Sequence, residues 1–186
     1  AGSIDYLTNQ SADYLRTYSR NASTEADAAF YNPAGTAFMK DGLSLQLNNQ
    51  TIIKNYSDTL VATGKKFETD MPTPFLPSLW AVYKKENIAG FLGFNAIGGG
   101  GQVDYKNGVP LMAQNAAAVN AKVAAVLNAS YGIPVSTVST SFDKGNLYVN
   151  QLYPSMTLGG AYAFNNNVSV SFGARAVYML RKYTGD

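Results

Sequence analysis

The sequence predicts an all-β protein in the form of a transmembrane antiparallel β-barrel, and three observations support this prediction. Only 14% of its 186 residues are charged, well below the roughly 25% usual for soluble domains. Long stretches alternate between apolar and polar residues, which is the period of a strand with two different faces. The connections between these stretches alternate between long and short, as in membrane barrels with tight turns at one rim and long loops at the other.

The composition argues against several other classes of protein. The chain has no cysteine and no histidine, which excludes disulfide frameworks, thiolate chemistry, serine–histidine nucleophile pairs and histidine metal sites. No pair of carboxylates stands at a recognisable spacing, so we predict a protein that is not an enzyme and that uses no metal or other cofactor. A net charge of +2, dispersed along the chain, does not indicate a nucleic-acid partner.

Residues 1–42 are expected to form a compact, mostly non-β segment. The sequence predicts a short helix within 9–20 and a second helix over 23–31, where alanines follow acidic residues. The second helix should end at Asn32, because Pro33 disfavours helical geometry in the residue before it.

Five long strands are expected after this segment. They cover residues 43–56, 75–84, 88–105, 147–164 and 168–181. The connections between them are long at 57–74, short at 85–87, long at 106–145 and short at 165–167. Within the 106–145 connection, the spacing of apolar residues predicts a helix over 109–130.

Each predicted strand has one aliphatic face and one face of small or polar residues. In the fourth strand, for example, Met156 and Leu158 alternate with Ser155 and Thr157. A soluble β-sandwich also alternates, but the strand length, the low charge and the unequal connections favour the barrel. Five strands are too few to close a barrel, so we expect the chain to be part of a longer polypeptide.

The stretch NASTEADAAFYNPAGTAFMKDGLSLQLNNQ, which contains Asn-Pro-Ala at 32–34, resembles the N-terminal portion of the FadL/TodX family of outer-membrane transporters for hydrophobic compounds. The start at Ala1-Gly2 also looks like a mature end left after signal cleavage. The resemblance implies a fourteen-stranded barrel in the bacterial outer membrane. It divides the chain into a hatch that plugs the lumen, 1–42, and a barrel wall, 43–186, with a helical extracellular loop at 106–145.

The resemblance also implies three groups of site residues. The extreme N-terminus contributes to the ligand pocket, as Ala1, Gly2 and Ser3. The hatch motif, which ends the hatch helix and leads into the first strand, is Asn32, Pro33 and Ala34. The inward kink that opens a lateral gap in the wall matches four glycines, which weaken a ladder and permit bulges: Gly98, Gly99, Gly100 and Gly101. A carboxylate partner could be Arg16, Arg20 or Arg175, and the sequence does not select among them.

The function that the resemblance implies is passive uptake of long-chain fatty acids or similar hydrophobic molecules by a monomeric barrel in contact with outer-membrane lipid. One alternative keeps the fold, since fold does not settle function: a barrel that acts as a partner or shuttle in protein export. A second alternative is a soluble secreted β-domain that binds a ligand or a partner.

Overall fold

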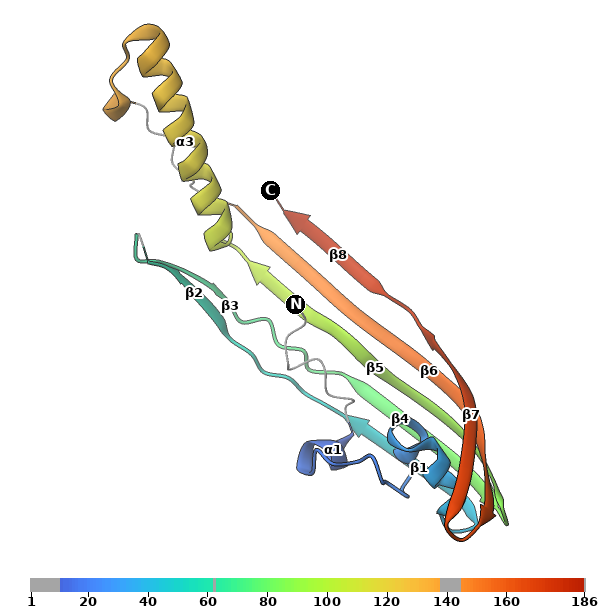
Figure 1. The fold of residues 1–186 in the computed structure, drawn as a ribbon. Coiled ribbons are helices and arrows are strands. Elements are labelled where there is room, and N and C mark those ends of the chain that lie inside the picture. Colours follow the sequence, from blue (N-terminus) through green and yellow to red (C-terminus); the bar gives the residue numbers. More distant parts are fainter. Residues whose placement is uncertain (1–10, 62, 138–144, 186) are drawn as a thin grey trace. The chain divides into compact units, whose positions relative to one another are not determined.

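The computed structural model describes residues 11–61, 63–137 and 145–185 (Figure 1). The chain is mainly β, with 49% strand, 24% helix and antiparallel sheets, as the sequence predicts. No closed barrel is present among the described residues. The chain divides into two compact units, the first of which contains the residues up to Ile52 together with Pro72–Gly101 and Gln151–Arg181.

The N-terminal segment, residues 11–41, contains three short helices: α1 (Ala12–Arg16), α2 (Ala28–Tyr31) and the 3₁₀ helix η2 (Pro33–Phe38). Ser11 caps α1, because its side-chain oxygen accepts a hydrogen bond from the Tyr14 backbone N–H. The ring of Tyr14 stacks on the ring of Tyr31, with centroids 5.2 Å apart, and so joins the first two helices.

The second helix is shorter than predicted but ends where predicted. The residues before Ala28 form turns rather than helix, so the prediction of a helix over 23–31 is wrong for its first half. The helix ends at Asn32, whose backbone N–H donates to the Ala28 carbonyl at 2.9 Å. Pro33 then begins the 3₁₀ helix, because its fixed φ suits the first turn of a helix.

The strands of the main sheet lie in the order β1-β4-β5-β6-β7, and β8 pairs with β6. The bounds agree closely with the sequence prediction for β4 to β6. The strands are β1 (Gly42–Asn49), β4 (Pro77–Lys85), β5 (Ile88–Tyr105), β6 (Leu147–Asn165), β7 (Val168–Val177) and β8 (Leu180–Gly185).

The predicted last strand, 168–181, is two strands, and a proline on the neighbouring strand explains the break. β7 ends at Val177, and the next residue, Tyr178, donates its backbone N–H to the carbonyl of Pro154 at 2.9 Å. Pro154 lies within β6 and has no N–H of its own. The ladder therefore lacks one return hydrogen bond at this point.

The second unit contains a hairpin that the sequence prediction missed. β2 (Tyr56–Leu60) pairs antiparallel with β3 (Lys65–Thr69) inside the stretch 57–74, which was predicted to be a polar connection. Gly64, with φ of +68°, makes the tight turn between them. The first predicted strand, 43–56, correspondingly ends earlier, at Asn49.

The second unit also contains α3 (Pro110–Tyr131) and the short 3₁₀ helix η3 (Val135–Thr137). The helix confirms the prediction over 109–130. It begins with Pro110 in its first turn and ends at Gly132, whose φ of +65° is easiest for glycine. Within the described part of the chain, no helix has both the length and the apolar character needed to cross a bilayer.

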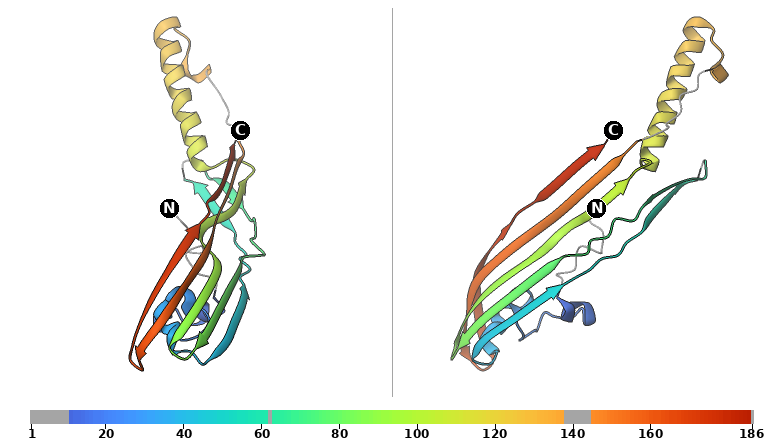
Figure 2. Two further views of the ribbon diagram at one scale, coloured as in Figure 1. Left: turned by 90° about the vertical axis from the view of Figure 1, so that its right-hand side faces the viewer. Right: turned by 180° about the vertical axis from the view of Figure 1, so that it is seen from behind.

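The two faces of the main sheet differ in the first unit. The inner face packs against the N-terminal segment, which lies on one side of the strands (Figures 1 and 2). Its core joins sheet residues to residues of the segment: Trp80, Val82, Ala89, Phe91, Ala161 and Ala163 with Ala26, Ala29, Phe30, Ala37 and Met39. The outer face is exposed and aliphatic or aromatic: Leu43, Leu45, Leu47, Tyr83, Ile88, Phe94, Met156, Leu158, Tyr162, Phe164, Val168, Val170 and Phe172.

Two glycines of β5 give a matched test of this packing. A Cβ added at Gly93 would lie 2.7 Å from the ring of Trp80, which is fully buried, whereas a Cβ at Gly90 would meet no atom within 4 Å. We expect Gly93→Ala to lower the free energy of unfolding by about 1–3 kcal/mol through overpacking. Gly90→Ala should leave it unchanged or raise it slightly. Denaturant midpoints of the two variants check this, and equal effects would contradict the described packing.

Candidate functional site

The N-terminal segment is organised around one buried carboxylate. The side chain of Asp27 is fully buried. Its oxygens accept hydrogen bonds from Arg20 Nε at 2.9 Å and Nη2 at 2.7 Å, from Ser23 Oγ at 2.7 Å and from Ser11 Oγ at 3.1 Å. Arg20 also forms an ion pair with Glu25. A buried charge is stable only when it is paired and hydrogen-bonded in this way.

These contacts set the protonation states of the pair. Burial alone would raise the pKa of Asp27, but the hydrogen bonds from Arg20 and Ser23, the Arg20 charge and the Ser11 hydroxyl outweigh burial and lower it. The hydrogen bond to Asp27 holds the pKa of Arg20 above its usual range, against the opposing effect of burial. The pair is therefore ionised at neutral pH.

The predicted hatch motif at 32–34 forms a compact turn that touches the sheet. The Asn32 side chain donates from Nδ2 to the Ser23 carbonyl at 3.0 Å, which ties the motif to the Asp27 network. The Ala34 carbonyl accepts a hydrogen bond of 2.9 Å from Ser169 Oγ on β7. Gly35 completes the turn, because a Cβ there would lie 2.6 Å from the Ser23 carbonyl oxygen.

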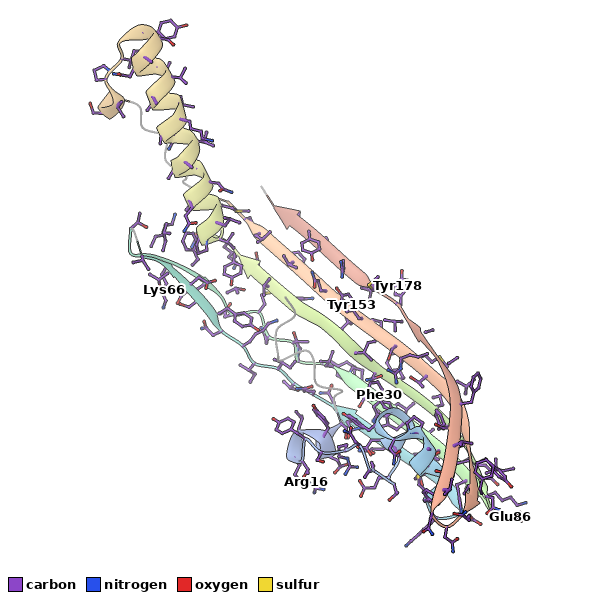
Figure 3. The ribbon with its side chains drawn as sticks, in the orientation of Figure 1. Arg16, Phe30, Lys66, Glu86, Tyr153 and Tyr178 are labelled. Atoms are coloured by element: carbon purple, nitrogen blue, oxygen red, sulfur yellow. The ribbon has the colours of Figure 1, made fainter. Side chains whose placement is uncertain are left out.

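A second contact joins the segment to the inner face through Phe30. Its ring packs against Trp80 on β4, with centroids 5.7 Å apart. The guanidinium of Arg175 on β7 lies 4.1 Å from the centroid of the same ring. Arg175 also donates from Nε to Thr157 Oγ1 on β6 at 3.0 Å. Figure 3 shows Phe30 between the N-terminal segment and the strands.

Two buried donors on the inner face have no hydrogen-bond partner in the described part of the chain. They are Trp80 Nε1 and Asn95 Nδ2, and both residues are fully buried, with 0% accessible surface. Asn95 accepts a hydrogen bond of 2.8 Å from Ser155 Oγ through its other side-chain atom, Oδ1. Buried donors are usually satisfied, so these two are exceptions to the general rule.

The four glycines at 98–101 lie within β5, and the backbone is distorted at two of them. Gly99 and Gly101 have φ of +113° and +57°, which non-glycine residues rarely adopt. A Cβ on Gly98 would lie 2.9 Å from the ring of Tyr153, and one on Gly99 would lie 2.5 Å from the Gln151 carbonyl oxygen. The stretch therefore remains part of a strand and lies in close contact with β6, and the lateral opening stays a prediction.

The segment before β4 adds to the irregularity of this region. The ladder between β4 and β5 runs from the Lys85–Ile88 pair to the Leu79–Phe94 pair. Continued in the same register, it would place the stretch 72–77 opposite 96–101. That stretch contains three prolines, at 72, 74 and 77, which cannot donate to a ladder.

The structure separates the three arginines that the sequence left open. Arg16 is exposed and pairs with Asp13 at 3.1 Å, and Arg20 is occupied by Asp27 and Glu25. Arg175 has no acidic partner among the described residues. A fourth arginine, Arg181, was not among these candidates, and its Nε donates to the Tyr153 hydroxyl at 2.7 Å. The sequence feature that could have identified it is its place on the polar face of the last predicted strand.

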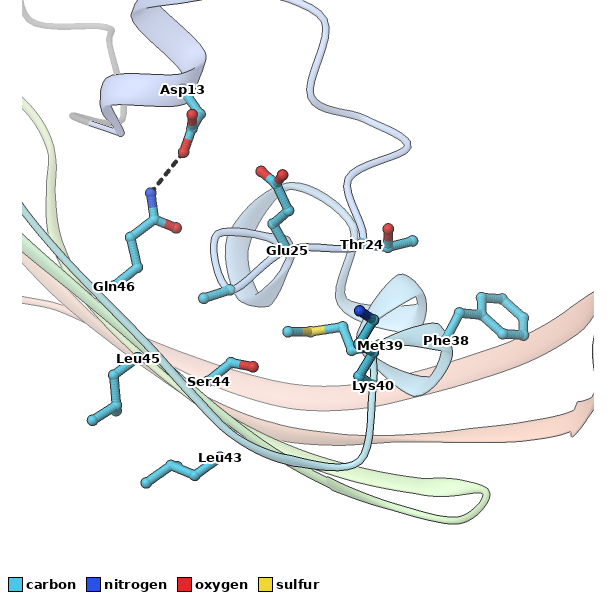
Figure 4. Close-up of a pocket in the computed structure, with 11 residues that line it drawn as sticks. Asp13, Thr24, Glu25, Phe38, Met39, Lys40, Leu43, Ser44, Leu45 and Gln46 are labelled. Atoms are coloured by element: carbon cyan, nitrogen blue, oxygen red, sulfur yellow. Dashed lines mark hydrogen bonds between the residues drawn. The ribbon is translucent and has the colours of Figure 1, made fainter.

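A pocket of about 780 Å³ lies between the N-terminal segment and β1 (Figure 4). Gln46 points into it and donates from Nε2 to Asp13 Oδ2 at 2.9 Å. Leu43 and Leu45 point away from the segment, toward the outer face. The predicted ligand residues Ala1, Gly2 and Ser3 lie outside the described residues.

Comparison of the chain with protein-family models, with curated proteins and with solved structures finds no match. In the part of the chain that the structure describes, no group of three acidic side chains is placed to hold a metal ion.

We expect Asp27→Asn to destabilise the N-terminal segment by about 3 kcal/mol, because it leaves the largely buried guanidinium of Arg20 without its main partner. Asp13→Asn is the matched control: it removes an ion pair to an arginine side chain that is 76% exposed, which is worth less than about 1 kcal/mol. Limited proteolysis of residues 11–41 measures both. Equal cleavage rates in the two variants would show that the network does not hold the segment.

The same carboxylate predicts a pH dependence. Because the pKa of Asp27 is lower in the folded protein than its unfolded value of about 3.9, its contribution to stability is complete above that value. The contribution is lost as the pH falls through the folded pKa. We expect the fluorescence of Trp80, which reports the Phe30 contact, to stay constant from pH 7 to 4 and to change below. A transition between pH 5 and 7, or an unaltered acid transition in Asp27→Asn, would contradict the assignment.

Proposed function

We propose that this protein is a FadL-type transporter of the bacterial outer membrane, which takes up long-chain fatty acids or similar hydrophobic compounds passively through a plugged barrel. The observation that supports the proposal best is the exposed apolar outer face of the main sheet. The inner face, where Trp80, Val82 and Phe91 lie among small and polar residues, is buried against the N-terminal segment, and large apolar residues are exposed on the opposite face.

The outer face has the character expected of a surface covered by lipid. Leu47 is 76% exposed, Leu158 is 61% exposed and Phe172 is 86% exposed, and cross-strand pairing places further apolar residues between them. Soluble monomeric proteins rarely expose apolar patches this extensive. The outer face therefore favours a membrane wall over a soluble secreted β-domain.

The N-terminal segment has the character expected of a hatch within a lumen. It meets the wall through polar contacts, such as the hydrogen bond from Ser169 to Ala34 and the contact of Arg175 with Phe30, and also through apolar packing against Trp80. Its own fold depends on a buried ion pair rather than on a large apolar core. Such a segment can rearrange locally without unfolding the wall, and ligand binding can shift its population.

In the second unit, α3 presents an apolar surface suited to the first contact with a hydrophobic ligand. Its exposed apolar residues include Leu111, Val119, Val123 and Val126. Lys122, Val123, Val126 and Leu127 line a small apolar hollow of about 230 Å³. We propose that this helix captures the ligand before it enters the barrel.

The glycine stretch at 98–101 suits a lateral exit. Each methylene of an acyl chain gains about 0.8 kcal/mol by leaving water, so a water-filled pore is a poor route for it. A side opening into the bilayer avoids returning the chain to water. The left-handed backbone at Gly99 and Gly101 and the nearby prolines leave this part of the wall with a weak ladder.

Proteoliposomes test the proposal. We expect vesicles that contain the purified protein to take up oleate faster than protein-free vesicles, and to take up a trisaccharide such as raffinose no faster. A barrel that only assists protein export predicts no acceleration of oleate. Extraction of the protein without detergent, or equal acceleration of oleate and raffinose, would contradict the proposed function.

A further inference from the structure

We propose that Arg175 is the anchor for the carboxylate of an acyl ligand, and that a carboxylate bound there releases Phe30 and loosens the N-terminal segment. This inference rests on the proposed function, because it names the chemical group that the transporter recognises. It assigns the recognition to the inner face of β4 to β7, where the segment meets the sheet.

The geometry leaves much of the Arg175 guanidinium available. Its Nε donates a hydrogen bond to Thr157 Oγ1, and its Cζ lies over the ring of Phe30, so the side chain is held by two contacts. The two terminal nitrogens have no hydrogen-bond partner among the described residues. A guanidinium oriented in this way can accept a carboxylate in a bidentate manner.

The charge at this position is not compensated by the N-terminal segment. Its described acidic residues are already engaged: Asp13 by Arg16 and Gln46, Glu25 and Asp27 by Arg20, and Asp41 by Lys84. A cation on the inner face that lacks an acidic neighbour favours an anionic ligand over a neutral one.

Neighbouring residues supply the rest of a site for an amphipathic molecule. Thr157 is the register partner of Arg175 and lies beside Gly93, on which the ring of Trp80 rests. The unpartnered N–H groups of Trp80 and Asn95 lie on this same inner face, and both can donate hydrogen bonds to a carboxylate or to a water bound to it. The rings of Phe30 and Trp80 offer apolar surface to the first methylenes of the chain.

The same geometry couples binding to the segment. Phe30 is held between Trp80 and Arg175, so a carboxylate that draws the guanidinium away from the ring removes one of these two contacts with the sheet. The coupling must be reciprocal, because a ligand that favours the released segment is bound more tightly by it. A neutral ligand of the same length has no such effect on Arg175.

The test compares oleate with oleyl alcohol, which has the same chain and no charge, using protein purified in detergent. We expect Arg175→Gln to weaken oleate binding about ten- to a hundredfold, the range for a lost charge-assisted hydrogen bond, and to change oleyl alcohol binding little. Arg16→Gln is the matched control, since it also removes one positive charge but from an exposed pair with Asp13. It should leave both ligands unaffected.

A second measurement follows the contact between the N-terminal segment and the sheet. The sequence contains a single tryptophan, Trp80, so its fluorescence follows the contact with Phe30. Oleate should change this signal in the original protein and in Arg16→Gln, but not in Arg175→Gln, and oleyl alcohol should change it in none of them. If Arg175→Gln fails to fold, Arg175→Lys, which retains the charge, should keep a preference for oleate over oleyl alcohol.

The outcomes separate this inference from the proposed function. Two results would show that Arg175 is not the carboxylate anchor while leaving the proposed transport function intact. The first is that the original protein binds oleate and oleyl alcohol equally well. The second is that Arg175→Gln remains folded and weakens the binding of both ligands alike. Equal affinity of Arg175→Lys for the two ligands also overturns the anchor. If the original protein binds neither ligand, the proposed function fails and the anchor fails with it.

Discussion

The buried carboxylate of Asp27 is the constraint on which the N-terminal segment depends. A charge without solvent must be compensated, and the compensation comes from Arg20, Ser23 and Ser11. These bonds hold the residues before Ala28 in turns and fix the position at which α2 begins. The Asn32 side chain bonds to the Ser23 carbonyl and extends the same network to the turn that contacts β7. The segment therefore holds a defined shape with very little apolar core of its own.

The main sheet has one face that is buried and one face that is exposed and apolar. Its inner face buries small and polar side chains together with Trp80, Val82 and Phe91, while its outer face leaves leucine, valine and phenylalanine exposed. In water this arrangement would be unfavourable, at about 25 cal/mol for each Å² of exposed apolar surface. In a bilayer the same surface would be solvated by lipid, and the backbone groups of a membrane wall must be satisfied by neighbouring strands. The faces, the N-terminal segment and the glycine stretch thus support one account of a plugged membrane wall.

Much of the fold could be predicted from local sequence. The end of α2 at Asn32, the bounds of β5 and the alternation of faces follow from a proline, from strand periodicity and from side-chain type. The sequence could not predict features that depend on distant partners. The helix before Ala28 is replaced by turns because Asp27 bonds to Ser11, sixteen residues away. The break after Val177 depends on Pro154 in the neighbouring strand, and the contact of Arg175 with Phe30 requires the sheet and the segment to be assembled.

The orientation of β1 in the membrane tests the central claim most directly. The chain has no cysteine, so single-cysteine variants at positions 43 to 47 can carry a spin label without background. The account predicts that collisions with lipid-dissolved oxygen are frequent at 43, 45 and 47 and rare at 44 and 46, with a period of two. A water-soluble relaxation agent that reaches 43, 45 and 47 as readily as other exposed sites would contradict the account, because the apolar face would then lie in water.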